Sequence, residues 1–158
     1  MISNSVNEKM ISFKELEKKI FKYVCELGCE ITRSILEAYD DAVAVKRDKQ
    51  KYRNKGKRAT CIKTVYGSVK YQRRIYGTIT ENGEKAYVYL LDAEMRMDKI
   101  GMISSNLAEK IAMTVTESPY CVTAETISST SGQSISASGV WNVMQRLGEK
   151  ISEEENTL

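Results

Sequence analysis

The chain has 158 residues, of which 42% are hydrophobic and 28% are charged, a composition typical of one folded domain or two small ones. This composition argues against a chain that is disordered throughout. No apolar run is long enough to span a bilayer, and the first residues contain no apolar signal core. We therefore expect a cytoplasmic protein that has no membrane partner.

The positive charge is concentrated in one stretch of the chain. Residues 46–76 contain twelve Lys and Arg but only one acid, Asp48, which gives this stretch a net charge of +11. The other residues include twelve basic and twenty acidic ones, a net charge of −8, so the formal net charge of the whole chain is only +3. Such a segregated stretch favours a polyanionic partner, although a solvated basic surface without a partner would have the same composition.

The first section, residues 1–45, is predicted to form a long amphipathic helix from about Ser12 to Val45. Its apolar residues advance by three or four positions, which is the spacing of one helix face. They are Phe13, Leu16, Ile20, Val24, Leu27, Ile31 and Ile35. The helix would be about 45–50 Å long, more than a compact domain of this size needs. We expect this stripe to pair with a second copy of the chain, and Gly28 to allow a bend or a close helix crossing.

The second section, residues 46–98, is predicted to form a basic antiparallel meander of three strands. Residues 60–66 and 69–76 are rich in β-branched and aromatic residues and flank a Gly-Ser turn, and residues 81–84 form a second turn before a strand at 86–91. The strict alternation in the second strand assigns its two faces. Val69, Tyr71, Arg73 and Ile75 share one face, and Lys70, Gln72, Arg74 and Tyr76 share the other.

The third section, residues 99–158, is predicted to be helical. One helix is marked by apolar residues from Ile103 to Val115, and a second begins at Ser118-Pro119, a typical helix start, and runs to about Ser129. After Gly132, a serine cap precedes the last helix. Its core face is predicted to hold Val140, Met144, Leu147 and Ile151, with Trp141 and Val143 at its flanks.

These sections together predict an α+β fold: a long N-terminal helix, a three-stranded antiparallel sheet and a C-terminal three-helix segment. The last two helices, joined by a short turn with glycine, match a helix-turn-helix, whose second helix enters the major groove of DNA. Any amphipathic helical hairpin would show the same polar outer face. The basic sheet before it makes double-stranded DNA the expected partner.

Two sets of side chains are candidates for contacting DNA. Cations of the basic section would contact phosphates, and polar residues of the last helix would contact base edges. The candidate phosphate contacts are Arg53, Lys55, Lys57, Arg58, Lys63, Lys70, Arg73 and Arg74. The candidate base contacts are Ser138, Asn142, Gln145 and Arg146.

The sequence offers no pattern for a metal site, a cofactor or a small-molecule substrate. The four cysteines are irregularly spaced and the chain has no histidine, which argues against a zinc site and against Ser-His or Cys-His catalysis. The acids cluster at Asp40-Asp41, at Asp92, Glu94 and Asp98, and at residues 153–155, where each cluster is explained as a helix end, a loop or a tail. We therefore expect reduced thiols and a chain without an active site of its own.

Several segments carry a family resemblance that covers residues 21–148. The most specific are residues 52–56 with the strand pair that ends in RRIY, and residues 118–148 with the Val140-Trp141 pair. These segments resemble the N-terminal part of the ISLre-type insertion-sequence transposases, a DDE-type family. The resemblance implies that the helix-turn-helix recognises the terminal repeats of an insertion sequence, ahead of a catalytic domain with an acidic, metal-binding triad.

The chain ends at Leu158, just past the last helix, so we expect a truncated transposase part in which the catalytic domain and its divalent metal are absent. Two other functions fit the same residues. One is a stand-alone repressor that binds a promoter. The other is an assembly module that binds protein through the first and last helices and does not bind DNA.

Overall fold

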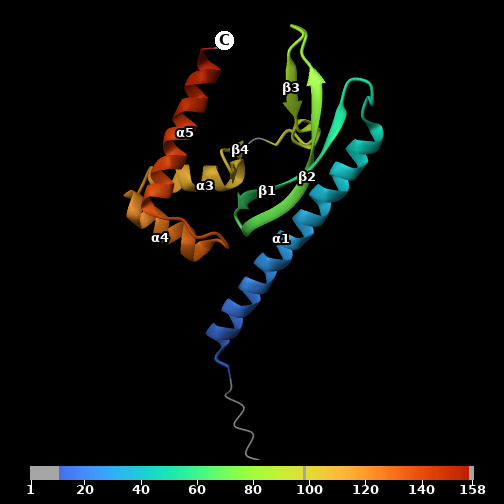
Figure 1. Ribbon diagram of the computed structural model, residues 1–158. Helices are drawn as coiled ribbons and strands as arrows, with labels where there is room; N and C mark the ends of the chain where they lie inside the picture. Colours follow the sequence, from blue (N-terminus) through green and yellow to red (C-terminus); the bar gives the residue numbers. More distant parts are fainter. Residues whose placement is uncertain (1–10, 98, 157–158) are drawn as a thin grey trace, which may run out of the picture.

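The computed structural model describes residues 11–97 and 99–156, and it has five helices and five strands in this part of the chain. Figure 1 shows a long helix beside a curled sheet, with a cluster of three helices on the other side of the sheet. The elements are α1 (Phe13–Lys46), β1 (Arg53–Thr64), β2 (Gly67–Ile79), β3 (Lys85–Val88), α2 (Leu90–Glu94), β4 (Lys99–Ile100), β5 (Ile103–Ser104), α3 (Ser105–Val115), α4 (Tyr120–Thr130) and α5 (Ala137–Glu155).

The sheet differs from the predicted three-stranded antiparallel meander. It has five strands in the order β3-β2-β1-β5-β4, and it is mixed because β1 and β5 run parallel while the other pairs run antiparallel. The N–H of Lys63 donates to the carbonyl of Met102 at 2.8 Å where β5 joins β1. The prediction missed β4 and β5 because two residues are too few to show alternation, and it assigned Ile103 to the following helix.

Helix α1 begins with a capping box. The Ser12 hydroxyl accepts from the N–H of Glu15, and the Glu15 carboxylate accepts from the N–H of Ser12. The helix then runs to Lys46, within a residue or two of the predicted boundaries. Its second half lies along the edge of β2 (Figure 1). The predicted long helix is therefore present.

The side of α1 that packs on the sheet is not the regular apolar stripe. It carries Cys25, Cys29, Leu36 and Asp40, which are buried or half-buried. Leu36 joins a core cluster with Val69 of β2 and other buried residues of β1, β2 and α2. The stripe from Phe13 to Ile35 faces solvent instead.

The three C-terminal helices form a second core. Ile100, Leu107, Ala108, Ile111, Ala124, Ile127, Val140 and Val143 are its buried members. Val143 is therefore a core residue and not only a flanking one. Trp141 lies on the outer side of α5 with 49% of its surface exposed.

The connection between α4 and α5 attaches the helical cluster to the sheet. The N–H of Gly132 donates to the carbonyl of Val65 at 2.9 Å, and the Ser68 hydroxyl donates to the Gln133 side-chain oxygen at 2.9 Å. Both bonds reach the tight turn between β1 and β2. The predicted turn with glycine is thus also a tertiary contact, which fixes α5 relative to the strands that carry most of the cations.

Candidate nucleic-acid interface

The register of β1 and β2 divides the candidate cations between two faces of the sheet. Lys57 lies opposite Arg74, and Lys63 lies opposite Ser68, so these residues share the outer face with Lys70. Arg58 lies opposite Arg73 on the other face, which also carries Val69 and the core. The hairpin therefore brings some of the predicted phosphate contacts together and separates others.

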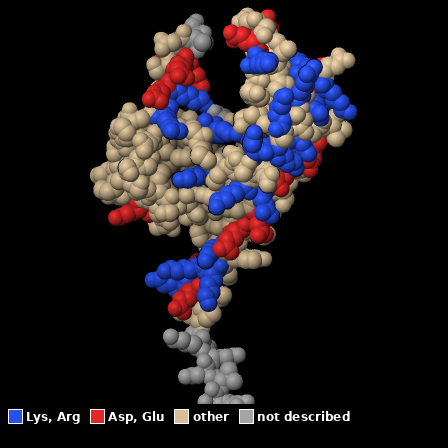
Figure 2. Space-filling model, in the orientation of Figure 1, with Lys and Arg blue, Asp and Glu red and all other residues tan. Residues whose placement is uncertain are grey.

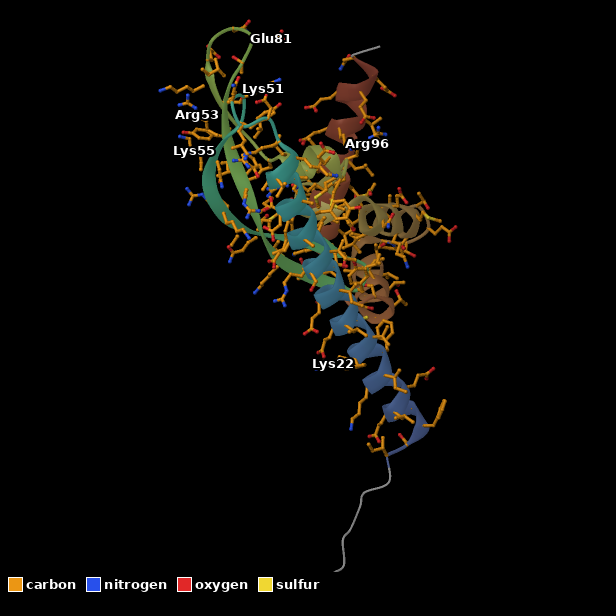
Figure 3. All side chains as sticks on the ribbon, turned by 90° about the vertical axis from the view of Figure 1, so that its right-hand side faces the viewer. Lys22, Lys51, Arg53, Lys55, Glu81 and Arg96 are labelled. Atoms are coloured by element: carbon orange, nitrogen blue, oxygen red, sulfur yellow. The ribbon has the colours of Figure 1, made fainter. Side chains whose placement is uncertain are left out.

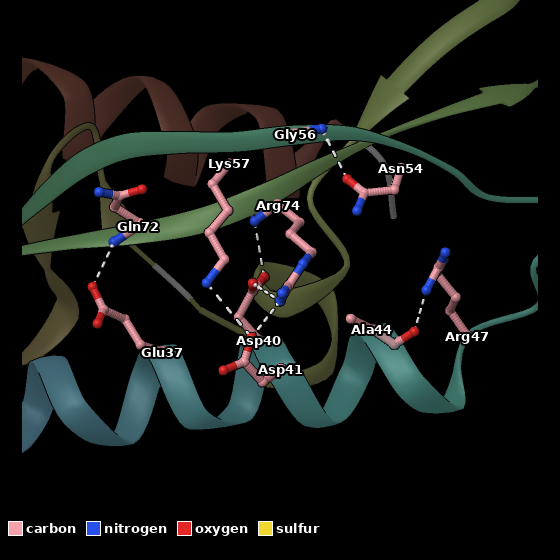
Figure 4. A network of polar contacts seen from close by, with 10 residues as sticks. All are labelled: Glu37, Asp40, Asp41, Ala44, Arg47, Asn54, Gly56, Lys57, Gln72 and Arg74. Carbon is pink, nitrogen blue, oxygen red and sulfur yellow. Dashed lines mark hydrogen bonds and ion pairs between the residues drawn. The ribbon is translucent and has the colours of Figure 1, made fainter.

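Arg74 is held within the fold by two acids of α1, as Figure 4 shows. Its guanidinium lies 2.7 Å from Asp40 and 2.7 Å from Asp41, and its backbone N–H also donates to Asp40 at 2.9 Å. Lys57 lies 3.6 Å from Asp41 in the same network. Arg74 therefore joins α1 to the edge of β2. The sequence had predicted that its side chain is free to contact phosphate.

The carboxyl of Asp41 is charged over a wider pH range than an ordinary aspartate. The hydrogen bond from Arg74, followed by the charge of Lys57, lowers the pKa of Asp41. A lowered pKa in the folded state contributes stability that is present above the unfolded pKa and is lost as pH falls through the folded pKa. We expect Asp41→Asn to show a smaller loss of stability on acidification through the aspartate range than the parent chain, measured by urea unfolding at successive pH values. An identical acid profile for both proteins would contradict this role.

Arg73 is buried, with only 8% of its surface exposed. Its guanidinium pairs with Asp92 of α2 and stacks on the Tyr89 ring, whose centroid lies 3.7 Å away. Lys99 adds a second cation 3.3 Å from Asp92, and burial followed by the charge of Arg73 lowers the pKa of Lys99. The expectation that Arg73 contacts phosphate is therefore wrong, because its side chain is buried against Asp92 and Tyr89.

Exposed cations at and just before the start of β1 line a common hollow. Lys51, Arg53 and Lys55, with Lys85 of β3, line a hollow of about 320 Å³ whose lining includes no acid. A bulge in the β1–β2 pairing follows Asn54, whose side chain accepts from the N–H of Gly56 at 2.8 Å. Gly56 has a φ of +99°, a conformation that glycine adopts without strain. This bend directs the start of the strand toward the β2–β3 hairpin.

The labelled side chains in Figure 3 show the direction of this group. Lys51, Arg53 and Lys55 project from one side of the sheet, whereas Arg96 lies on the side of α5. Figure 2 shows Lys and Arg gathered over the sheet, with a hollow between α5 and the β2–β3 hairpin. The hollow thus separates α5 from the β2–β3 hairpin, and the basic surface and α5 do not form a single flat plane.

The predicted base contacts all lie on the exposed side of α5. Ser138, Asn142 and Gln145 follow one another at helical spacing and are exposed, as is Arg146. The Arg146 guanidinium packs over Gly101 in the β4–β5 turn, at a position that a Cβ on that residue would occupy. The helix therefore offers amide and guanidinium groups that can pair with base edges.

The sequence interpretation missed some members of this surface. Exposed Trp141 lies beside Asn142 on α5, and it had been assigned to the flank of the core. Lys46 at the end of α1, and Lys49 and Lys51 between α1 and β1, are exposed but were left out of the candidate contacts. Their charge was visible in the sequence.

The sequence pattern of an uncharacterised protein family, UPF0236, matches residues 6–157 of the chain. The chain belongs to the UPF0236 family. No curated protein and no solved structure matches this UPF0236 chain. Family membership covers nearly the same residues as the resemblance described above, and it assigns no activity.

The four cysteines of this UPF0236 chain are free thiols, and Cys61 lies opposite Lys70 in the β1–β2 register. Cys25 is buried, Cys29 and Cys61 are half-buried, and Cys121 is exposed. Burial, followed by the charge of Cys25, raises the pKa of Cys29.

Within residues 11–97 and 99–156, no three His, Cys, Asp or Glu side chains are placed to hold a metal ion. Asp98 of the second predicted acid cluster lies outside the described residues. In the same part of the chain, no helix has the length and apolar character needed to cross a membrane.

Proposed function

We propose that this protein binds double-stranded DNA, with exposed cations of the sheet on the phosphates and α5 at the base edges. One observation carries the proposal. Of the twelve Lys and Arg in residues 46–76, Lys57, Arg73 and Arg74 pair with acids and Arg47 contacts backbone carbonyls and the Tyr76 ring. The remaining eight have no acid within ion-pair distance among the described residues, and all are exposed.

Five of these eight lie on the β1–β2 hairpin and the other three directly precede it, so the like charges repel one another, and a polyanion relieves this repulsion. The phosphates of DNA match such a surface because their binding releases condensed counterions. The revised phosphate contacts are Arg53, Lys55, Arg58, Lys63 and Lys70, joined by Lys51 and Lys85 at the hollow. Lys57 keeps a share in this role because its ion pair with Asp41 is long and exposed.

The resemblance to ISLre-type transposases supports a more specific proposal. The duplex would be the terminal repeat of an insertion sequence, and binding would serve DNA transposition. Ser138, Asn142, Gln145 and Arg146 on one exposed helix side provide the groups that a sequence-specific contact requires.

A salt titration tests the phosphate contacts. We expect log affinity for a random duplex, measured by fluorescence anisotropy, to fall with log salt at a slope of about −4 to −5, since about five cations would contact phosphates. The double variant Lys63→Ala/Lys70→Ala should reduce the magnitude of that slope by about 2, and the matched control Lys14→Ala/Lys110→Ala should leave it unchanged. A flat salt profile, or equal effects of the two double variants, would refute the electrostatic contacts.

A second comparison tests the base contacts. Sequences selected from a randomised duplex pool should bind Arg146→Ala more weakly, by about 1–3 kcal/mol, whereas random duplex should bind both proteins alike. Lys70→Ala should weaken both duplexes equally. If the selection yields no preferred sequence, the role of α5 is refuted and the phosphate contacts remain.

A further inference from the structure

Helix α1 carries an apolar stripe that nothing in the described part of the chain covers. Its members are Phe13, Leu16, Ile20, Val24, Leu27, Ile31 and Ile35, and all are exposed. Val24, at the middle of the stripe, has 56% of its surface exposed. Monomeric proteins rarely expose a contiguous apolar patch of more than a few hundred Å². The stripe is therefore a surface that requires a partner.

The sheet does not pack against this stripe. The residues of α1 that contact the body of the protein are Cys25, Cys29, Leu36 and Asp40, which lie on another side of the helix. In Figure 1 the first turns of α1 also stand clear of the other elements. A partner can therefore lie along the stripe from end to end without displacing any contact of the fold.

The spacing of the stripe fits a second helix of the same sequence. The first four members each have a counterpart eleven residues later: Phe13 with Val24, Leu16 with Leu27, Ile20 with Ile31, and Val24 with Ile35. Eleven residues in three turns correspond to about 3.67 residues per turn, close to the period of a straight helix. Two copies of such a helix stay in contact over their whole length with very little supercoiling.

We propose that two copies of this chain associate through α1, with the helices antiparallel and their stripes in contact around Val24. This surface does not include the basic face of the sheet or the exposed side of α5. The proposal therefore does not depend on DNA binding.

The charges beside the stripe favour the antiparallel arrangement. Lys19 and Glu30 are eleven residues apart and so lie on the same flank, five residues before and six residues after Val24. Antiparallel pairing about Val24 places Lys19 of each copy beside Glu30 of the other. Glu17 lies on the stripe itself, between Phe13 and Ile20, so a parallel pair would bring its two copies together within the contact.

The exposed apolar area of the stripe is also large enough for a dimer interface. Seven large apolar side chains, each with roughly half of its surface free, amount to several hundred Å² per chain, comparable to the about 800 Å² per partner of a standard interface. Phe21 and Tyr39, which are also exposed on α1, flank the stripe and would add to it.

Light scattering of the full chain tests the proposal without any DNA. At tens of micromolar chain we expect a mass twice the 17.9 kDa of one copy. Val24→Glu and Ile31→Glu should return the mass to that of one chain, because each places a charge in the contact. The control Met113→Glu, on an exposed apolar residue of α3, should remain dimeric. Circular dichroism should show the helix content unchanged in all three variants.

A charge swap tests the orientation. Lys19→Glu and Glu30→Lys should each raise the dimer dissociation constant several-fold, and the double variant should restore it. A monomeric parent chain, or a mass that Val24→Glu does not change, would overturn the dimer. Failure of the double variant to restore association would overturn the antiparallel arrangement.

Discussion

Replacing Asp40 with alanine is expected to lower the free energy of unfolding by about 3 kcal/mol, near the lower end of the range for breaking a buried ion pair. Asp40 is fully buried, and it is the acid that joins α1 to β2. Its carboxylate accepts both from the guanidinium and from the backbone N–H of Arg74. The variant would leave a guanidinium with part of its charge uncompensated and a strand N–H without its acceptor.

The position of Asp40 explains why the effect should be large. Helix α1 covers the part of the β2 edge that β3 does not pair, and the N–H groups of Gln72 and Arg74 donate to Glu37 and Asp40 of the helix. Side-chain carboxylates thus replace a neighbouring strand at this edge. Their loss would expose unpaired backbone groups as well as an unpaired charge.

Two further variants separate these contributions. Asp41→Ala removes the other acid that Arg74 contacts, and it should cost only a small part of the loss because that carboxylate is exposed to solvent. Asp40→Asn keeps an acceptor for the N–H of Arg74 but removes the charge, and it should fall between the other two. Urea unfolding at neutral pH measures all three. Equal stabilities of Asp40→Ala and Asp41→Ala would show that burial of the carboxylate has no special effect.

The four longer helices could be predicted from sequence because their ends are marked locally, whereas α2 was missed because its first two residues were assigned to the third strand. The Ser12–Glu15 capping box satisfies backbone N–H groups at the start of α1, and Pro119 is the N-cap of α4, where no side chain caps the helix. Gly132 follows the end of α4. The core face of α5 followed from helical spacing for Val140, Met144 and Leu147, whereas the prediction for Ile151 is wrong because 49% of its surface is exposed. Trp141 and Val143 were misjudged because both lie near the border of that face, where the packing of α3 and α4 decides which of them is buried.

The sheet could be predicted only in part. The strands of the β1–β2 hairpin are long enough to alternate, and their turn is marked by Gly67, whose φ is +144°. Strands β4 and β5 have two residues each and exist because β1 supplies a parallel partner. Their formation depends on residues far away in the sequence, so no local pattern reveals it.

The candidate site could also be predicted only in part. Charge segregation identified the basic surface, but it could not distinguish Arg58 from Arg73, although the two lie opposite each other in the sheet. Asp92, nineteen residues after Arg73, decides that only Arg73 is paired and buried. Gly28 was likewise read as a helix crossing or a bend, whereas the close neighbour is the Tyr66 ring, 3.2 Å from where a Cβ would lie.

Replacing Gly132 with alanine is expected to cost about 3 kcal/mol, at the upper end of the range for overpacking. A Cβ at this position would overlap the backbone carbonyl of Tyr66 and lie 3.0 Å from the sulfur of Cys25. The Tyr66 carbonyl cannot rotate away, because the turn between β1 and β2 fixes the backbone there. The N–H of Gly132 also donates to the carbonyl of Val65, so relief of the overlap would break that hydrogen bond.

Gly148→Ala is the matched control, because a Cβ there would meet nothing within 4 Å and the residue lies inside α5. Alanine favours a helix interior over glycine by about 0.5–1 kcal/mol, so this variant should be more stable than the parent chain. The same substitution should therefore change the free energy of unfolding in opposite directions at two glycines only sixteen positions apart.

Because Gly132 holds α4 and α5 against the sheet, Gly132→Ala should also make the two cores unfold at different urea concentrations. Trp141 fluorescence and far-ultraviolet circular dichroism measure the two transitions. A single transition at the parent midpoint would show that this contact does not join the two cores.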